Sequence, residues 1–393
     1  MMNFPRTLLL TVKAPDARYG YKAIRELVGA LPSDRIVWCS MASMETRYEP
    51  PCRHCQCAPK PPHWRFKTSA CGLFYRYEFQ SRRVARRIKE SCADFRPQLL
   101  WVMSEWGAAP VGRRLASMLA IPVHMTVHDA HETARFFVPS LYYPLYIRSL
   151  HGLAAASASM DAVSLELLDH IRQGYPQLGG ANSLVLAPSV SDDAMKSRSA
   201  APSDFDQAFR RIGFCGTLRT SAGQWESFLR LLGDLPFRLE IVAFTERSSL
   251  PAVDLPGNVS FKFQEYVKTE KEVVRSLRDQ GVYACYLGLW REPERRLFAR
   301  TSLSAKLSTY AAAALPVIVD GPRDAAAWRL VEQYGAGILC EDRSTVTARR
   351  LKQLFADSGS WKRMSQGAAV LCREEFSLER NVARFGNLLA RYA

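Results

Sequence analysis

Short apolar runs alternate with amphipathic stretches along almost the whole chain, and this alternation restricts the fold more than any other feature of the sequence. The first run covers residues 7–12, and after Pro15 and Asp16 a helical pattern follows at 21–31. Strands and helices that alternate in this way build parallel sheets covered by helices. We therefore expect an α/β protein, with further strands at 35–40, 99–103, 123–127, 153–158 and 183–187 and a helix at 111–120.

A polar stretch divides this alternation into two halves. Residues 190–205 are rich in Ser, Asp and Pro and have little periodicity, as is typical of a linker between domains. At 393 residues the chain also exceeds what one hydrophobic core usually supports. We place a first domain at 1–190, a linker at 191–207, a second domain at 208–376 and a closing helix at 377–393, with strands of the second domain at 212–215, 239–242, 259–263, 282–287, 316–319 and 337–340.

Both halves have the pattern of Rossmann-like, doubly wound domains. Such sheets bind ligands outside the carboxyl ends of their strands, so two of them in series are expected to face each other across a cleft that holds the ligand. Binding proteins and sugar-nucleotide epimerases use the same layout. The fold alone therefore does not select a function.

No transmembrane helix or secretory signal is expected. The longest uncharged apolar run, residues 310–319, has ten residues, whereas a helix needs roughly 20 to span a bilayer. The first residues also lack the apolar core and cleavage site of a signal peptide. We expect a cytoplasmic protein.

The chain carries a formal net charge of +15, which favours a polyanionic partner such as nucleic acid or acidic lipid. At helical spacing, one face of residues 74–89 is apolar, whereas the opposite arc combines Tyr75 and Phe79 with basic side chains, namely Arg82, Arg83, Arg86, Arg87 and Lys89. Aromatic and basic residues on one side suit an acidic membrane surface. We expect peripheral binding at the inner face of the cell membrane; an ordinary solvated helix face is the alternative.

The chain has ten cysteines, which in a cytoplasmic protein are more often buried apolar residues or metal ligands than disulfides. Six are scattered singly, and four lie close together in the sequence, namely Cys52, Cys55, Cys57 and Cys71. These four, in and after a Pro-rich insertion at 49–62, could hold a structural zinc, although their spacing is not that of a standard zinc ribbon. A loop of reduced thiols is the alternative.

The most specific signal lies in the second half. The sequence Ser-Ala-Lys-Leu-Ser-Thr-Tyr-Ala-Ala-Ala-Ala-Leu-Pro-Val-Ile-Val, residues 304–319, resembles the donor-binding segment of the retaining GT-B glycosyltransferases of the group 1, family 4-like type. Lys306, Leu307 and Tyr310, together with the Pro-Val-Ile at 316–318, match in type and spacing. The turn at 213–218 and the strand end at 122–129 extend the resemblance over most of the chain.

The resemblance implies that the second domain binds the diphosphate of a nucleotide-sugar. Cations and helix N-termini suit such a group, and the expected donor-binding residues are Gly216, Arg219, Ser304, Lys306 and Thr309. Two positions depart from the family. Its ribose-binding glutamate is Thr309 here, and the glycine before the Pro-Val-Ile strand is Ala314. Since a carboxylate binds two hydroxyls more strongly than a threonine does, the identity of the donor is left open.

In the first domain a predicted strand ends in His128-Asp129, and the family often carries His-Asp beside the sugar at this point. The resemblance implies a catalytic role for both residues, with Gly20 and Glu105 on the acceptor side. It further implies a hexosyltransferase that transfers with retention to a glycan or glycolipid and needs no metal cofactor. A catalytically silent scaffold that binds nucleic acid or an anionic surface is the alternative, although no usual nucleic-acid motif is present.

Overall fold

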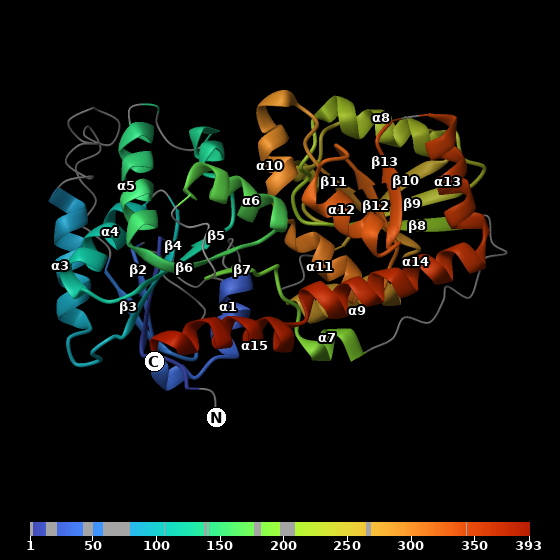
Figure 1. Ribbon diagram of the computed structural model, residues 1–393. Helices are drawn as coiled ribbons and strands as arrows, with labels where there is room; N and C mark the ends of the chain where they lie inside the picture. Colours follow the sequence, from blue (N-terminus) through green and yellow to red (C-terminus); the bar gives the residue numbers. More distant parts are fainter. Residues whose placement is uncertain are drawn as a thin grey trace. The chain divides into compact units, whose positions relative to one another are not determined.

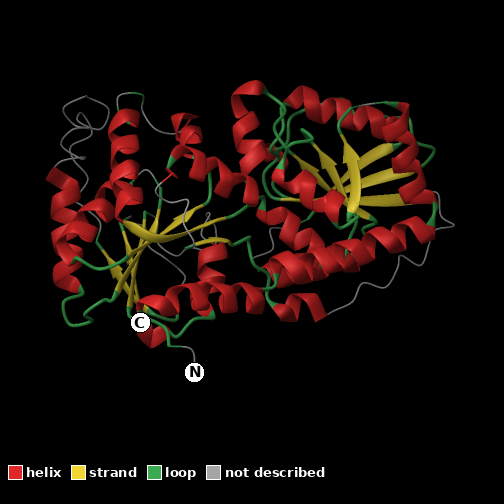
Figure 2. Cartoon of the chain, in the orientation of Figure 1, coloured by secondary structure: helices red, strands yellow, loops and turns green. Residues whose placement is uncertain are grey.

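The computed structural model divides the chain into two units, residues 1–187 with 379–393 and residues 188–378. It describes residues 3–12, 22–41, 50–57, 79–105, 107–136, 140, 142–176, 182–196, 209–264, 269–342 and 344–393. Each unit consists of a sheet with helices on both faces (Figures 1 and 2). Most of the predicted linker, 197–207, lies outside the described residues, and its described part belongs to the second unit.

The first unit contains a seven-stranded parallel sheet in the order β3-β2-β1-β4-β5-β6-β7. Its strands are β1 (Thr7–Thr11), β2 (Ile36–Ser40), β3 (Arg53–Gln56), β4 (Leu99–Met103), β5 (Val123–Val127), β6 (Ser157–Ala162) and β7 (Ser183–Val185). Its helices are α1 (Lys22–Gly29), α3 (Ser81–Ser91), α4 (Ala108–Leu119), α5 (Tyr143–Ala156), α6 (Leu165–Gly174) and α15 (Leu378–Leu389). The four strands β1, β2, β4 and β5 are buried at every residue, which explains the continuous apolar runs in β1, β2 and β4.

Two of the sequence predictions for this unit are corrected. The strand expected at 153–158 is wrong, because α5 continues to Ala156 and β6 begins at Ser157. Leu153 and the three alanines after it are strong helix formers, so helix propensity decides this segment. In addition, the insertion at 49–62 contains a strand, β3, that pairs in parallel with β2 at the edge of the sheet. The residues of β3 are mostly polar and half of them are exposed, so the sequence lacks the apolar pattern that would predict a strand here.

The closing helix α15 completes the core of the first unit. Phe385 and Leu389 are fully buried and pack with Trp38 and Trp101 in one apolar cluster. The rings of Phe385 and Trp101 lie 4.7 Å apart. The last helical segment of the chain is therefore an integral part of the unit formed by the first 187 residues.

The second unit contains a six-stranded parallel sheet in the order β10-β9-β8-β11-β12-β13. Its strands are β8 (Phe209–Cys215), β9 (Arg238–Phe244), β10 (Val259–Phe263), β11 (Ala284–Gly288), β12 (Val317–Asp320) and β13 (Gly337–Cys340). Its helices are α7 (Asp192–Lys196), α8 (Ala222–Gly233), α9 (Glu270–Asp279), α10 (Arg296–Thr301), α11 (Ala305–Ala312), α12 (Ala326–Gln333), α13 (Thr345–Ala356) and α14 (Ser358–Leu371). All six predicted strands of this half are present.

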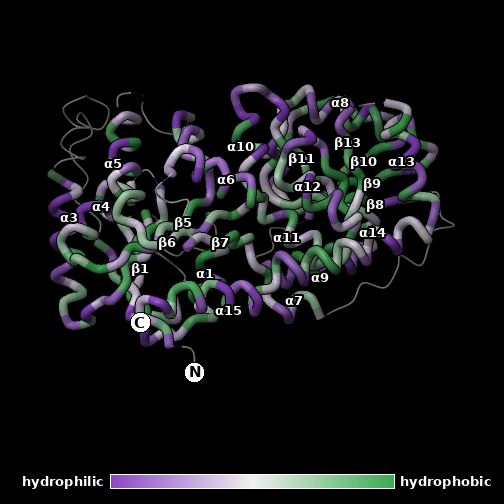
Figure 3. Tube along the Cα trace, viewed as in Figure 1, coloured by the Kyte–Doolittle hydropathy of each residue, from purple (hydrophilic) through white to green (hydrophobic). Residues whose placement is uncertain are grey.

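Hydrophobic residues concentrate on the strands, and hydrophilic residues are frequent along the outer helices (Figure 3). On one face of the second sheet, Trp225 and Phe228 of α8 pack against Tyr286 of β11, with ring centroids 5.1 Å and 4.3 Å away. On the other face, Leu277 of α9 lies so close to Gly213 of β8 that no larger residue fits there without movement. The sheet is thus buried between two layers of helices.

Gly337, the first residue of β13, tests how tightly this sheet is packed. A Cβ atom at this position would overlap the backbone carbonyl of Val317 in the neighbouring strand, whereas one at Gly223 in α8 would have nothing within 4 Å. We expect Gly337→Ala to lower the free energy of unfolding by about 1 to 3 kcal/mol, the usual cost of overpacking. Gly223→Ala, the control, should be neutral or slightly stabilising. Denaturant unfolding measures both, and equal stabilities would contradict the packing described.

Candidate functional site

The second sheet reverses its strand order between β8 and β11, and the chain's donor-like motif lies beside this point. From β8 the sheet grows through β9 and β10 in one direction, and from β11 through β12 and β13 in the other. In parallel sheets, ligands bind outside the carboxyl ends of the strands at such a reversal. The residues that follow β8 and those that begin α11 therefore form the candidate site.

Gly216 follows the last residue of β8 and turns the chain away from the sheet. Its φ is +65°, in the left-handed region that favours glycine. Its Cα faces Lys306, because an added Cβ would lie 3.6 Å from the Cε of that lysine. The turn leaves Gly216 and Thr217 exposed, so the backbone here is open to a ligand.

Lys306 lies in the first turn of α11 and reaches back to this turn. Ser304 caps the helix, and its hydroxyl accepts a 3.4 Å hydrogen bond from the backbone N–H of Lys306. The ammonium of Lys306 donates to the carbonyl oxygen of Thr217 and lies 4.8 Å from the centre of the Phe214 ring. Ser304 and Lys306, two of the expected donor-binding residues, are thus brought together with Gly216.

Burial sets the protonation of this lysine. Although the residue keeps some exposed surface, desolvation of its ammonium lowers the pKa of Lys306 to about 7, and the nearby positive charge of Arg219 acts in the same direction, against the opposite influence of Cys215. Arg219 itself is exposed, with its guanidinium 5.1 Å from the ring centre of Phe298. A diphosphate bound here would bring negative charge next to the two basic side chains, Lys306 and Arg219.

Tyr310 anchors α11 to the end of β8. Its fully buried hydroxyl accepts a 3.1 Å hydrogen bond from the backbone N–H of Cys215. Burial raises the pKa of Tyr310 well above its usual value, so this hydroxyl stays protonated. The contact fixes where the helix N-terminus, and with it Lys306, lies relative to the Gly216 turn.

Thr309 brings a carboxylate from another helix to the same place. Its hydroxyl donates a 2.7 Å hydrogen bond to Oε1 of Glu270, and it also lies 3.1 Å from the carbonyl oxygen of Ala305. Glu270 is the first residue of α9, whose N-terminus is held by a capping box between Thr269 and Glu272. From the sequence alone Thr309 marks the loss of a carboxylate, and nothing in the local pattern points to Glu270, which stands 39 residues earlier.

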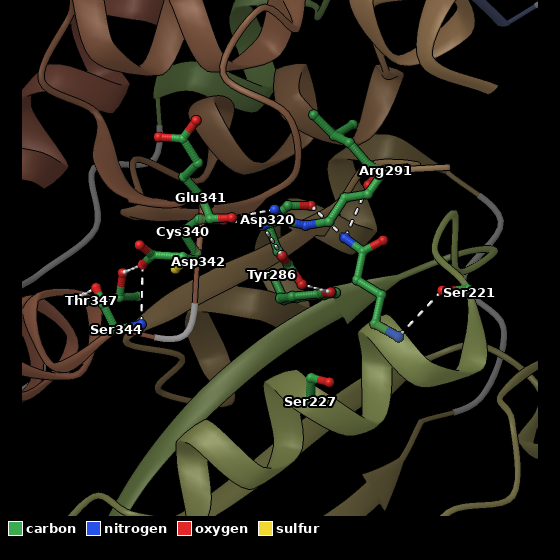
Figure 4. Close-up of polar contacts among 12 residues, drawn as sticks. Ser221, Ser227, Tyr286, Arg291, Asp320, Cys340, Glu341, Asp342, Ser344 and Thr347 are labelled. Atoms are coloured by element: carbon green, nitrogen blue, oxygen red, sulfur yellow. Dashed lines mark hydrogen bonds and ion pairs between the residues drawn. The ribbon is translucent and has the colours of Figure 1, made fainter. Parts of the chain in front are cut away.

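A second polar network supports the carboxyl ends of the neighbouring strands (Figure 4). Asp320, the last residue of β12, is fully buried, and its carboxylate accepts hydrogen bonds from Arg291 at 2.9 Å and from the Tyr286 hydroxyl at 2.8 Å. Arg291 also donates to the carbonyl oxygens of Cys340, the last residue of β13, and of Glu341, which follows it. Gln224 of α8 donates to the carbonyl oxygens of Leu289 and Asp320. The network ties three strand ends and one helix together.

In the first unit, the predicted catalytic and acceptor residues lie at the carboxyl ends of two adjacent strands. His128 and Asp129 follow β5, and Glu105 follows β4. His128 is half-buried and Asp129 is exposed. Desolvation raises the pKa of Tyr146 above its usual value, and the charges of Tyr175, Glu105 and Asp129 contribute to this rise. Gly20 lies outside the described residues.

A buried histidine beside them was missed as a site residue. His131 follows β5 by four residues, and its ring nitrogens lie 3.5 Å from the Ser104 hydroxyl and 3.3 Å from the Tyr175 hydroxyl. Desolvation lowers the pKa of His131 to about 4, so the ring is neutral at physiological pH. Its position shortly after the predicted strand at 123–127 gives no sign that the Tyr175 hydroxyl, from a distant segment, lies against its ring.

The predicted metal ligands do not all lie together. Cys52 is buried in the apolar cluster that contains Trp38, and Cys71 lies outside the described residues. Cys55 and Cys57 approach Cys39 instead. A hydrogen bond from Cys39, together with the charge of Arg53, lowers the pKa of Cys55 to about 6 against the opposing effect of burial.

The basic residues of α3 form one exposed face. Arg82, Arg83, Arg86, Arg87 and Lys89 are exposed, whereas Val84, Ala85 and Ile88 are buried beneath them. Phe79, just before the helix, keeps 58% of its surface exposed, and Tyr75 lies outside the described residues. Among the helices of the described ranges, none combines the length and apolarity that crossing a bilayer requires.

Comparisons with known proteins agree with this architecture. A scan against protein families found no match, and a search of curated proteins found no similar sequence. Among solved structures, sucrose-phosphate synthase from Thermosynechococcus elongatus is similar with a TM-score of 0.68, 14% identity and 98% of both chains covered.

Two further structures give the same result. HepE of Anabaena in complex with UDP has a TM-score of 0.66 and 12% identity over 98% of this chain and 99% of that one. The lipopolysaccharide outer core galactosyltransferase WaaB has a TM-score of 0.64 and 10% identity, covering 98% of this chain and all of that one (100%). The chain therefore has the GT-B fold of two Rossmann-like domains.

The lowered pKa of Lys306 predicts how stability depends on pH. In the unfolded chain the lysine binds its proton up to about pH 10.5, whereas in the folded chain it loses the proton near 7, so burial of the charge destabilises the fold most below pH 7. We expect Lys306→Met, which keeps the contact with Phe214, to be more stable than the wild type at pH 6. The difference should shrink as the pH rises through about 7 toward 10.

Urea unfolding of both proteins across this pH range measures the effect. Lys362→Met, which removes an exposed lysine on α14, is the control and should show no such trend. A constant difference between Lys306→Met and wild type at all pH values would mean that the lysine titrates normally.

Proposed function

We propose that the protein is a glycosyltransferase that moves a hexose from a nucleotide-sugar to a glycan or glycolipid, such as a surface polysaccharide or its precursor. The observation that carries this proposal is the ammonium of Lys306 held against the Gly216–Thr217 turn at the strand reversal of the second sheet. The GT-B fold over nearly the full length supports it. HepE, one of the similar structures, is a complex with UDP, and another of its structures contains UDP-glucose.

On this proposal the second unit binds the donor. Lys306, when it takes up a proton, and Arg219 neutralise the diphosphate, and the exposed backbone of Gly216 and Thr217 allows close approach. Ser304 holds the first turn of α11 in place. Since negative charge grows on the leaving phosphate as the glycosyl bond breaks, cations fixed beforehand stabilise the transition state more than the ground state.

Glu270 takes the place of the family's glutamate in this proposal. A glutamate at position 309 would itself bind the ribose, whereas here the Thr309 hydroxyl holds the carboxylate of Glu270 at 2.7 Å. A carboxylate has several lone pairs, so Glu270 held in this way can also accept a hydrogen bond from a ribose hydroxyl. The departure at position 309 is thereby compensated within the same edge of the sheet.

His128 and Asp129 serve catalysis and Glu105 serves the acceptor in this scheme, as the family resemblance implies. Retention and independence from a catalytic metal rest on the same resemblance. The sequence contains one Asp-x-Asp pattern, Asp204-Phe205-Asp206, but it falls in the predicted linker and outside the described residues. Activity that persists after thorough chelation would support the metal-free reaction.

The first test is nucleotide binding. Among UDP, GDP, ADP, CMP and dTDP and their sugars, we expect at least one pair to raise the thermal midpoint. For that ligand, Lys306→Met should weaken binding about 10- to 100-fold, because a charge-assisted hydrogen bond contributes about 1.5 to 3 kcal/mol. Affinity for the wild type should also fall as the pH rises through about 7, since binding requires the protonated lysine.

Glu270→Gln should weaken binding of the nucleotide but not of inorganic pyrophosphate, because it changes only the ribose contact. Lys362→Met and Asp279→Asn, exposed positions on α14 and at the far end of α9, are the matched controls. If no nucleotide binds, or if Lys306→Met binds as the wild type does, the donor assignment is wrong and a non-catalytic scaffold becomes the better explanation.

We also propose that the basic face of α3 binds an anionic membrane. The exposed Phe79 beside Arg82, Arg83 and Arg86 supports this, because aromatic side chains favour the headgroup region and each basic residue near acidic lipid contributes about 1 kcal/mol. Lys89 and Arg87 add charge to the same helix.

Changing Arg82, Arg83 and Arg86 to Glu should abolish sedimentation with phosphatidylglycerol vesicles at low salt and leave nucleotide binding intact. The triple change Arg349, Arg350 and Lys352 to Glu, on α13 of the other unit, removes the same charge and is the control. Wild-type protein that ignores acidic vesicles, or a variant of α3 that still sediments, would refute membrane binding through this helix.

A further inference from the structure

Three thiols from three separate chain segments converge in the first unit. Cys39 lies in β2 and Cys55 is its direct partner in β3, whereas Cys92 caps the C-terminus of α3. Their sulfur atoms all lie within 4.8 Å of one another, and those of Cys39 and Cys92 are 3.7 Å apart. Within the described ranges this is the one group of three or more potential ligands gathered closely enough to hold a metal ion.

A fourth thiol lies next to this group. Cys57 follows β3, where its backbone N–H donates a 2.9 Å hydrogen bond to the carbonyl oxygen of Ser40. Its side chain is buried and hydrogen-bonds the thiol of Cys39. Two strands and the end of one helix thus supply three sulfur ligands that lie together, and Cys57, beside Cys39, is placed to complete the four that a structural zinc requires.

The sulfur spacing fits a zinc ion and does not fit a disulfide. Zinc binds thiolate at about 2.3 Å, so two sulfurs of a regular tetrahedron lie about 3.8 Å apart. The 3.7 Å between Cys39 and Cys92 agrees with this value. A disulfide would need about 2.05 Å between the sulfurs. All four cysteines are free thiols in the structure.

Positive charge next to the sulfurs supports the same conclusion. Four thiolates around Zn²⁺ carry two net negative charges, which burial opposes unless cations are nearby. Arg53, directly before His54 and Cys55, places its guanidinium 2.7 Å from Asp94 and 2.8 Å from the Ser91 carbonyl, next to the end of α3. The positive charges of Arg53 and Arg87 act on Cys55 and Cys57, respectively.

We propose that Cys39, Cys55, Cys57 and Cys92 bind one structural Zn²⁺. The ion ties the edge strand β3 and the end of α3 to β2. Binding requires four thiolates, so the thiol protons pass to solvent as the metal enters. This ligand set replaces the one expected from sequence spacing, and it does not depend on the proposed transferase activity, whose donor residues lie in the other unit.

The test is the metal content of the full chain, expressed with added zinc and purified under reducing conditions. Elemental analysis should find about one zinc and no stoichiometric iron per chain. Cys92→Ser and Cys57→Ser should each lose most of the zinc, whereas Cys52→Ser, the control at another buried cysteine of this unit, should keep it. Nucleotide binding by the zinc-containing protein provides a separate check on the second unit.

A spectroscopic measurement covers the case in which the serine variants fail to fold. Wild-type protein in which Co²⁺ replaces zinc should show the thiolate-to-cobalt charge-transfer band and the strong ligand-field bands of tetrahedral sulfur coordination. Wild-type protein without zinc, a Cys39–Cys92 disulfide in the reduced preparation, iron instead of zinc, octahedral cobalt, or full zinc retention by Cys92→Ser would each overturn the proposal.

Discussion

Both sheets of the protein are wholly parallel, and this constraint determines where the chemistry can be. Parallel strands send all of their carboxyl ends to one edge, so the segments that follow them meet there even when they are far apart in sequence. In the second unit this edge gathers Gly216, Glu270 and Lys306, which come after three different strands. The buried Asp320 network secures the neighbouring strand ends, so the site rests on a rigid frame.

The fold could be predicted from the sequence, and the segment around Lys306 could be singled out, because both depend on local patterns. Continuous apolar runs marked the buried strands, and the segment from Lys306 to the Pro-Val-Ile strand carried its own spacing. Glu270 could not be found in this way, because its relation to Thr309 exists only once α9 and α11 have packed side by side. The same is true of His131, whose partners Ser104 and Tyr175 come from distant segments.

The cysteines show the limit of sequence spacing most clearly. Cys52 and Cys55 are close in the sequence and were therefore predicted to bind the same metal. In the structure they lie apart, because Cys52 is buried in the apolar cluster that contains Trp38. Pairing of β3 with β2 instead sets Cys55 opposite Cys39, and α3 adds Cys92. A short polar strand at a sheet edge has no apolar pattern. The pairing of β3 with β2, which forms the cysteine cluster, could therefore not be predicted from hydrophobic periodicity.

The position of α15 has a consequence for how the protein is made. The first unit consists of residues 1–187 and 379–393, and Phe385 of α15 packs against Trp101 in its core. On the ribosome, the second unit is synthesised in full before α15 emerges, so it can fold while its neighbour still exposes apolar surface around Trp101 and His124. The order of synthesis is thus reversed in the order of completion, because the unit whose synthesis begins first is the last to receive all the residues of its core.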